Sequence, residues 1–326
     1  TLYTALYHTL LAPSVFADAD GRYRGPDDQV HEGKLDGRPF TFHSTFSLWD
    51  TFRAEHPLLT LVQPADYTND VVNSLIASQR QSPYQILPVW QFHGQETWTM
   101  IGYHAVPVIA DAWMKGIRGY DGKAALDAMV KSATYAPYGG LGDYMRLGYV
   151  PIDKEPEAAS KTVEYAYDDW TIARMARDLG QAEVATTFEK RAAYWRNSFD
   201  AKTGFLRARK SDGTYREPFN PTAINYGSDY TEGNAWQYSW FAPQDLGGVV
   251  APYARSTTQY AQAWAEAKAT RPAGFLFGIG YGSDTNGLGQ QTAPRPGAAT
   301  DRPQDEPRSS AHCRGLVRAR PAKRGT

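Results

Sequence analysis

The chain has 326 residues and a formal net charge of −1, so it can bury one large core or two smaller ones but offers no net positive field to nucleic acid. Cys313 is the only cysteine, which excludes a disulfide within the chain and any metal site built on several cysteines. The 9 Trp and 21 Tyr are a high aromatic content, which carbohydrate-handling proteins often use.

The ends of the sequence predict part of a longer protein. The first residues, TLYTALYHTLLAP, have neither an initiator Met nor the charged start of a signal peptide. No apolar run approaches the roughly 18 residues of a membrane span. We therefore expect the interior of a longer protein, with no signal peptide in this chain.

Apolar residues recur at helical spacing in successive pairs of segments, which predicts antiparallel helix hairpins. In chain order, the predicted helices are 45–62 with 67–81, 99–117 with 122–135, and 160–180 with 182–200, and 231–241 opens a fourth pair. Ser160 and Gly180 have the cap chemistry to begin and end their helix.

Long connections rich in Gly, Pro, Asp and Tyr separate the pairs, as in 16–40 and 205–229. This arrangement predicts an all-α protein, a partial (α/α)6 toroid of antiparallel hairpins with long connecting loops. A helical solenoid is the alternative, but solenoid repeats share a fixed period and have short loops.

The sequence divides into three parts. Residues 1–250 are expected to form an incomplete toroidal domain, and 251–282 leave open whether they are helical. From 283 to 326 there is no Phe, Tyr or Trp, while Arg, Pro and Ala dominate, so we expect disorder or an out-of-frame tail.

Unusual polar residues lie near the ends of these helices. Trp49, Asp50 and Arg53 fall within one turn, so Asp50 and Arg53 can form an ion pair or hold vicinal hydroxyls together. His104 interrupts an apolar stretch, where a lone His is more often a core residue than a ligand. Asp168 and Asp169 can equally face solvent or bond a neighbouring loop.

The stretch YTEGNAWQYSWFAPQD, 230–245, surrounds Glu232 with aromatic rings and amides. Rings stack on the C–H face of a pyranose and amides bind its hydroxyls, so the stretch suits a sugar. The alternative is a buried helix in which Glu232 follows a capping Thr231 in the first turn.

Three motifs in this order, FSLWDTFR, EYAYDDW and TEGNAWQY, resemble the catalytic domain of glycoside hydrolase family 92. The resemblance runs from about Thr4 to Val249. It implies a calcium-dependent, inverting, exo-acting α-mannosidase that releases terminal mannose from α-mannosides or N-glycans. It also implies an extracellular or periplasmic location and an N-terminal β-sandwich domain in the full-length parent.

The resemblance assigns roles to particular residues. Glu232 becomes the general acid that protonates the leaving oxygen. The residues implied to bind the sugar are Trp49, Asp50, Arg53, His104 and Trp236, and those implied to bind the metal, Ca²⁺, are Asn234 and Gln237.

The sequence departs from the family after PQDLGG. The family pattern continues with GNEP, GNDD and GQMS motifs that supply a calcium ligand and the general base, and none of them is here. An inverting enzyme needs a second carboxylate, and the sequence shows no general base. We therefore expect this chain to be inactive or impaired. The alternatives are a non-catalytic mannose-binding remnant or another (α/α)6 glycosidase, of the glucoamylase or trehalase type.

Overall fold

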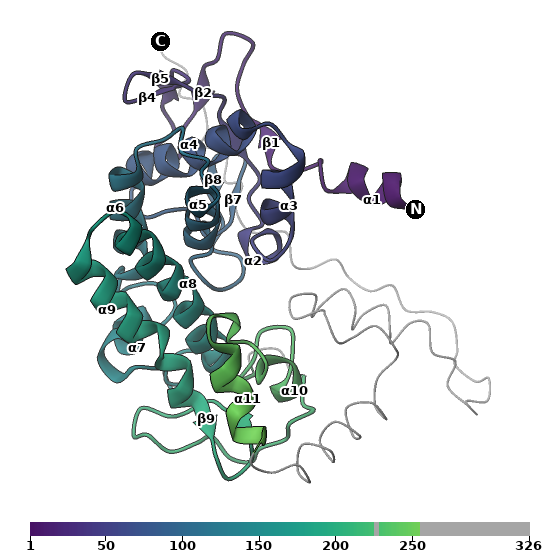
Figure 1. The fold of residues 1–326 in the computed structure, drawn as a ribbon, viewed down its shortest axis with the longest axis vertical. Helices are drawn as coiled ribbons and strands as arrows, with labels where there is room; N and C mark the ends of the chain where they lie inside the picture. The colour runs from purple at the N-terminus through teal and green to yellow at the C-terminus, as the bar shows by residue number, and fades with distance from the viewer. Residues whose placement is uncertain (225–227, 255–326) are drawn as a thin grey trace, which may run out of the picture.

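The computed structural model describes residues 1–224 and 228–254 and is dominated by helices (Figure 1). The helices are α1 (Leu2–His8), α2 (Leu48–Thr51), α3 (Glu55–Val62), α4 (Ala65–Gln81), α5 (Ala105–Met114), α6 (Gly122–Ala133), α7 (Leu141–Leu147), α8 (Ala158–Asp178), α9 (Ala182–Ala192), α10 (Ala235–Tyr238) and α11 (Leu246–Ala254), with short 3₁₀ helices η1 (Tyr194–Ser198) and η2 (Pro243–Asp245). Within these residues, no helix combines the length and the apolar character needed to span a bilayer.

The described strands have two residues each and pair into small antiparallel ribbons in the loops. The pairs are β1 (Ser14–Val15) with β6 (His43–Ser44), β2 (Tyr23–Arg24) with β3 (Val30–His31), β4 (Lys34–Leu35) with β5 (Arg38–Pro39), β7 (Gln91–Phe92) with β8 (Gln95–Glu96), and β9 (Phe199–Asp200) with β10 (Phe205–Leu206). In register, Ser14 lies opposite Ser44 and Phe205 opposite Asp200. Such ribbons fasten loops and leave the fold helical.

Helix α8 is the central element, and Figure 1 shows it between α5 and α9. It packs against α9, α5 and α6, and it is buried on all sides along most of its length. A helix buried on all sides is expected to be apolar throughout. Helix α8 instead carries buried Glu164, Asp168 and Asp169, each of which requires a partner from another element.

The helix boundaries differ from the sequence prediction where local turns intervene. The predicted helix 45–62 is divided into α2 and α3, which are separated at 52–54. The predicted helix 99–117 begins only at Ala105, after Gly102 takes a left-handed backbone. Helices α4, α6, α8 and α9 lie within two residues of prediction at their starts. Gly180 follows α8 at φ +71°, so its predicted role as the end of the helix is confirmed.

Two residues predicted to lie at helix starts, Ser160 and Glu232, lie elsewhere. Helix α8 begins at Ala158 after Glu157, and Ser160 lies inside the helix, where its Oγ accepts a hydrogen bond from the Thr231 amide at 2.9 Å. Helix α10 has only four residues and begins after Asn234, so Glu232 lies in the preceding loop and not in a first helical turn. The residue before Glu232 is therefore joined to α8.

Further hydrogen bonds join the start of α8 to the loop before Glu232. The Glu157 amide donates to the Ser228 carbonyl at 2.9 Å, and the Ala159 amide donates to the Asp229 carbonyl at 3.0 Å. Helix α11 extends to Ala254, across the predicted boundary at 250. The predictions for 283–326, and for 251–282 beyond 254, lie outside the described residues.

Candidate active site

Glu164, in the middle of α8, is a fully buried carboxylate on which several elements converge. One oxygen, Oε1, accepts hydrogen bonds from Trp49 Nε1 at 3.3 Å and Arg53 Nη2 at 2.9 Å. The Tyr238 hydroxyl lies 3.3 Å from the same oxygen. The other oxygen, Oε2, lies 2.8 Å from His104 Nε2. All three motifs of the sequence thus meet at one side chain.

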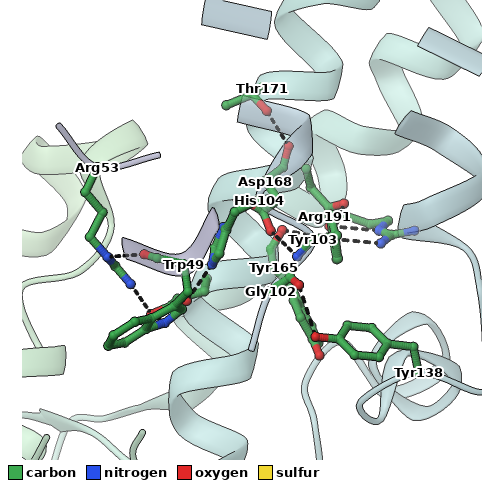
Figure 2. Close-up of polar contacts among 12 residues, drawn as sticks. Trp49, Arg53, Gly102, Tyr103, His104, Tyr138, Tyr165, Asp168, Thr171 and Arg191 are labelled. Carbon is green, nitrogen blue, oxygen red and sulfur yellow. Dashed lines mark hydrogen bonds and ion pairs between the residues drawn. The ribbon is translucent and has the colours of Figure 1, made fainter. Parts of the chain in front are cut away.

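His104 bridges two carboxylates, as Figure 2 shows for Asp168. Its Nδ1 lies 2.8 Å from Asp168 Oδ1, while Nε2 faces Glu164. Because ionised carboxylates only accept, we assign a proton to both ring nitrogens, which makes the ring an imidazolium. Burial alone would lower the pKa of His104, but the charge of Asp168 and the hydrogen bonds to both carboxylates raise it.

Charges of alternating sign therefore run from Arg53 through Glu164 and His104 to Asp168. Burial opposes ionisation of Glu164, yet the neighbouring Arg53 and His104 lower its pKa. A buried charge is tolerated only when it is paired and hydrogen-bonded, and each member of this chain has a partner of opposite sign. We name these four residues the charge chain.

The backbone around His104 fits the ring closely. Gly102 has φ +86°, and a Cβ at this position would lie 2.0 Å from His104 Nε2, so only glycine leaves room for the ring. Phe52 stacks on the imidazole at a centroid distance of 4.1 Å. The Tyr103 amide donates to Asp168 Oδ2 at 3.0 Å. The ring cannot shift without breaking these contacts.

Arg53 connects the charge chain to the aromatic residues around it (Figure 2). Its Nε donates to the Trp49 carbonyl at 2.9 Å, and its guanidinium carbon lies 4.8 Å from the Trp49 ring centre and 5.3 Å from that of Phe241. Its one described ion pair is with Glu164, and among the described residues Nη1 has no partner. Because of its Nη1 group, the guanidinium can donate further hydrogen bonds. Asp50, on the same turn, is half-buried.

Asp169 belongs to a separate network that is structural. Its oxygens accept hydrogen bonds from the hydroxyls of Tyr103 at 2.7 Å and Tyr144 at 2.9 Å, and from Arg191 Nε at 2.9 Å. Both Asp168 and Asp169 are 0% exposed, so the expectation that they face solvent is wrong. The other expectation, a bond to a neighbouring loop, is confirmed for Asp168 by the Tyr103 amide.

Glu232 lies in a strained loop. Its φ of +45° is left-handed, which is uncommon for a residue with a Cβ, and such outliers concentrate at functional sites. The side chain is half-buried, and its Oε2 is a buried oxygen with no hydrogen-bond partner among the described residues. A buried oxygen without a partner is available to a hydroxyl or ether oxygen of a ligand.

Asn234 and Gln237 satisfy backbone groups at the start of α10. Asn234 Oδ1 accepts from the Trp236 amide at 3.1 Å, and Gln237 Oε1 accepts from the Asn234 amide at 3.0 Å, which forms a capping box. The part of the chain described contains no group of three or more His, Cys, Asp or Glu side chains able to hold a metal ion. Asn234 and Gln237 offer amide oxygens, which Ca²⁺ can take, so their role as ligands stays a prediction.

The remaining predicted site residues divide into two groups. Trp49, Arg53 and His104 are brought together by Glu164, but both ring nitrogens of His104 are engaged, so the structure offers none for a sugar. Trp236 is half-buried and packs edge-on against Phe205 at a centroid distance of 4.8 Å. Its contact with a sugar stays a prediction.

Sequence reasoning missed Glu164 and Glu157. Glu164 lies in EYAYDDW, where the signal was a glutamate on an otherwise buried helix face four residues before Asp168. Glu157 has φ +60° at the start of α8. Burial raises its pKa, Lys161 opposes this, and the charges of Glu164 and Glu232 raise it further. Glu157 is thus a partly buried carboxyl at the point where α8 meets the loop before Glu232.

The chain is similar to several known proteins. The model of the "Glycosyl hydrolase family 92 catalytic domain" matches residues 1–260. A family GH92 alpha-mannosidase from Bacteroides thetaiotaomicron, solved in complex with mannoimidazole, is 40% identical with a TM-score of 0.78. The match covers 83% of this chain and 36% of that protein. A second protein of this bacterium, a family GH92 inverting mannosidase, is 36% identical with a TM-score of 0.70, over 77% of this chain and 34% of that one.

A curated relative from Arthroderma benhamiae, an uncharacterized secreted glycosidase, is 26% identical over 241 residues, which are 59% of this chain and 31% of that protein. The chain thus spans about a third of the length of these relatives. With a family model that covers most of the described residues and a carboxylate site built from the three motifs, the chain belongs to glycosyl hydrolase family 92.

Proposed function

We propose that this chain is part of an inverting, exo-acting α-mannosidase in which Glu232 is the general acid. The observation that carries the proposal is the unpartnered, buried Oε2 of Glu232 in a left-handed loop held against α8. Two of the family GH92 structures similar to this chain are named as an alpha-mannosidase with mannoimidazole and an inverting mannosidase. Membership of the family supports the same reaction here.

In the proposed reaction, Arg53 and Trp49 hold the terminal mannose. The further donors of Arg53 bind hydroxyls. Trp49 is 3% exposed and Arg53 lies over its ring, so its own contact with the sugar stays a prediction. Glu232 gives its proton to the glycosidic oxygen as the bond from the anomeric carbon to that oxygen breaks. Water attacks the opposite face and loses a proton to a general base, which we place in a part of the full-length protein that follows the PQDLGG pattern.

The test of Glu232 compares leaving groups in a longer protein that carries these residues at the length of the relatives. Glu232→Gln keeps the shape but cannot donate a proton, so hydrolysis of α-mannobiose should fall by about 10²–10⁴-fold. Hydrolysis of an aryl mannoside with a good leaving group should fall much less, because that oxygen needs little protonation. An equal loss on both substrates would remove Glu232 from the acid role.

We also propose that the complete enzyme depends on calcium. When bound, the ion would coordinate the oxygens of two adjacent mannose hydroxyls. Asn234 and Gln237 stay predicted ligands, although the structure gives both a role in the capping box. Exhaustive chelation should abolish hydrolysis by the longer protein, and Ca²⁺ but not Zn²⁺ should restore it. Undiminished turnover after chelation would contradict the calcium requirement.

The wider setting follows from the family and stays a proposal. We place the substrate among mannose-containing glycans and the protein outside the cytoplasm, with support from the secreted relative and the mannosidase structures. We further propose that the helices belong to an (α/α)6 toroid whose later hairpins, and an N-terminal β-sandwich, lie in the rest of the full-length protein. The helix pair α8 and α9 supports the hairpin arrangement.

A further inference from the structure

We infer that Glu164 is the positioning residue for the proposed sugar-contacting pair, Trp49 and Arg53, and that His104 and Asp168 hold Glu164 in place. The inference rests on the proposed function for the identity of the ligand. The geometry on which it stands is the convergence of the Trp49 indole, the Arg53 guanidinium and the His104 ring on one buried carboxylate.

Trp49 and Arg53 are bound to each other as well as to Glu164. Trp49 Nε1 and Arg53 Nη2 both donate to Glu164 Oε1, and Arg53 Nε donates to the Trp49 carbonyl. These three bonds fix the indole and the guanidinium relative to each other. Arg has a planar fork of donors, so fixing Nε and Nη2 also fixes the direction of Nη1. The donors of Arg53 are thereby presented in one orientation, with the buried Trp49 ring as their support.

Glu164 is held in place by His104, which is in turn bound by Asp168. Glu164 Oε2 is bound by His104. The His104 ring stacks on Phe52, is bound by Asp168, and lies so close to Gly102 that a side chain there would clash with it. Glu164 and Asp168 lie one turn apart on α8 and approach the same imidazole from two sides. The carboxylate therefore has one position in which both of its oxygens are satisfied. Side chains that bind sugars gain from such support because looseness weakens oriented hydrogen bonds.

Asp169 shows how a role in positioning differs from a role in general stability. Asp169 is the next residue after Asp168, is equally buried, and accepts bonds from Tyr103, Tyr144 and Arg191. It has no described contact with Trp49, Arg53 or Glu164. A change at Asp169 should loosen the fold as much as a change at Glu164 but should leave the pair in position. Asp169→Asn is therefore the matched control.

The experiment uses the whole 326-residue chain and methyl α-mannoside, with calcium present, and follows binding by calorimetry. Glu164→Leu removes both acceptors and should weaken binding more than about 100-fold, whereas Glu164→Gln keeps an acceptor for Arg53 and should weaken it about tenfold. Asp169→Asn should change binding less than about twofold while lowering the melting temperature. Wild-type affinity in Glu164→Leu, or an equal loss in Asp169→Asn, would overturn the inference.

A second readout does not depend on the sugar. In wild type, NMR should show a slowly exchanging Arg53 Nε proton and protons on both His104 ring nitrogens. Glu164→Leu should speed exchange of the Arg53 signal, and Asp169→Asn should leave it unchanged. If the wild-type chain binds no mannoside, the proposed function fails for this chain while the Arg53 signal still decides the positioning. An unchanged Arg53 signal in Glu164→Leu would refute it.

Discussion

Glu55, which is half-buried, and His56, which is buried, are neighbours at the start of α3, and each has one buried polar atom without a partner in the part of the chain described. Glu55 Oε1 and His56 Nε2 have no hydrogen-bond partner among the described residues. Burial, together with the charge of Asp50, raises the pKa of Glu55 to about 7. Burial lowers the pKa of His56 to about 4. Each residue thus favours its neutral form in the folded protein, and the two limit stability from opposite sides of the pH scale.

Removing the ionisable group at position 55 should change the pH dependence of stability. The folded pKa of about 7 lies above the ordinary value of 4.5 for a glutamate, so the contribution of Glu55 to stability is full below about pH 4.5 and is lost as pH rises through 7. After allowance for its partial exposure, Glu55→Gln should raise the free energy of unfolding at pH 8 by about 1–2 kcal/mol. At pH 4 it should give no gain. Denaturant-induced unfolding of both proteins at pH 4 and pH 8 measures these free energies.

The control for this prediction is Glu189→Gln, which removes a charge from an exposed pair with Arg177. Its effect on the free energy of unfolding should be much smaller than that of Glu55→Gln at pH 8, and should be small at both pH values, since exposed ion pairs contribute little. A gain for Glu55→Gln at pH 4 equal to that at pH 8 would show that the carboxyl is not strained by ionisation.

At this scale the sequence predicted some site residues and concealed others. Trp49 and Arg53 could be predicted because they lie within one turn of a recognisable motif. Glu164 could not, because its partners lie at positions 49, 53, 104 and 238, and only the fold brings them to one carboxylate. For the same reason His104 looked like a lone polar residue, although it has two acidic partners.

At the scale of elements, one serine of α8 binds the residue next to Glu232 through its side chain. Ser160 Oγ accepts from the buried Thr231 amide, and Ser132 Oγ on α6 accepts from the Leu87 amide at 2.8 Å in the same way. Both serines are buried. The two serines thus make the same kind of hydrogen bond, but only the bond of Ser160 lies next to Glu232, so Ser132 serves as the control.

Ser160→Ala and Ser132→Ala should each lower the free energy of unfolding by about 1–3 kcal/mol, because each leaves a buried amide without an acceptor. Only Ser160→Ala should speed hydrogen exchange at residues 231–233, measured by mass spectrometry or NMR under native conditions. If exchange there is equally slow in both variants, the serine does not hold the Glu232 loop. In a longer, active protein, Ser160→Ala should also reduce hydrolysis.

The helices themselves were largely predictable, while their breaks were not. Periodicity and Gly180 located α8 and α9, because helix periodicity and a left-handed cap are local signals. The break between α2 and α3, and the loop before α10, depend on contacts with α8. Thr231 had the composition of a cap, yet Asn234 caps α10, because tertiary bonds draw residue 231 toward Ser160.

At the scale of the whole molecule, the 326 residues should not hydrolyse mannosides alone. They span about a third of the length of the similar mannosidases, and the sequence contains none of the family motifs expected to supply the general base. Without a base, water cannot be deprotonated on the face opposite the leaving group. Mannose release from α-mannobiose, with calcium added, should stay near background for this chain.

The control is a longer protein at the length of the relatives, which should turn over the same substrate. Near-UV circular dichroism of the short chain verifies that it is folded during the assay. Multiple turnovers by the short chain that disappear in Glu232→Ala would show that it contains a base of its own. Tight sugar binding without turnover would instead favour the mannose-binding alternative.

The charge chain also has a consequence for how the polypeptide folds. Glu164 is separated by 115 residues from Trp49, 111 from Arg53, 60 from His104 and 74 from Tyr238, so its contacts are strongly non-local. Closing a loop of this length costs roughly 4 kcal/mol of chain entropy. A partly assembled chain would leave a charge buried without its counter-ion, which is strongly unfavourable. Desolvation of these groups should therefore come late in folding, in one concerted step, after the helices of both halves of the chain have formed.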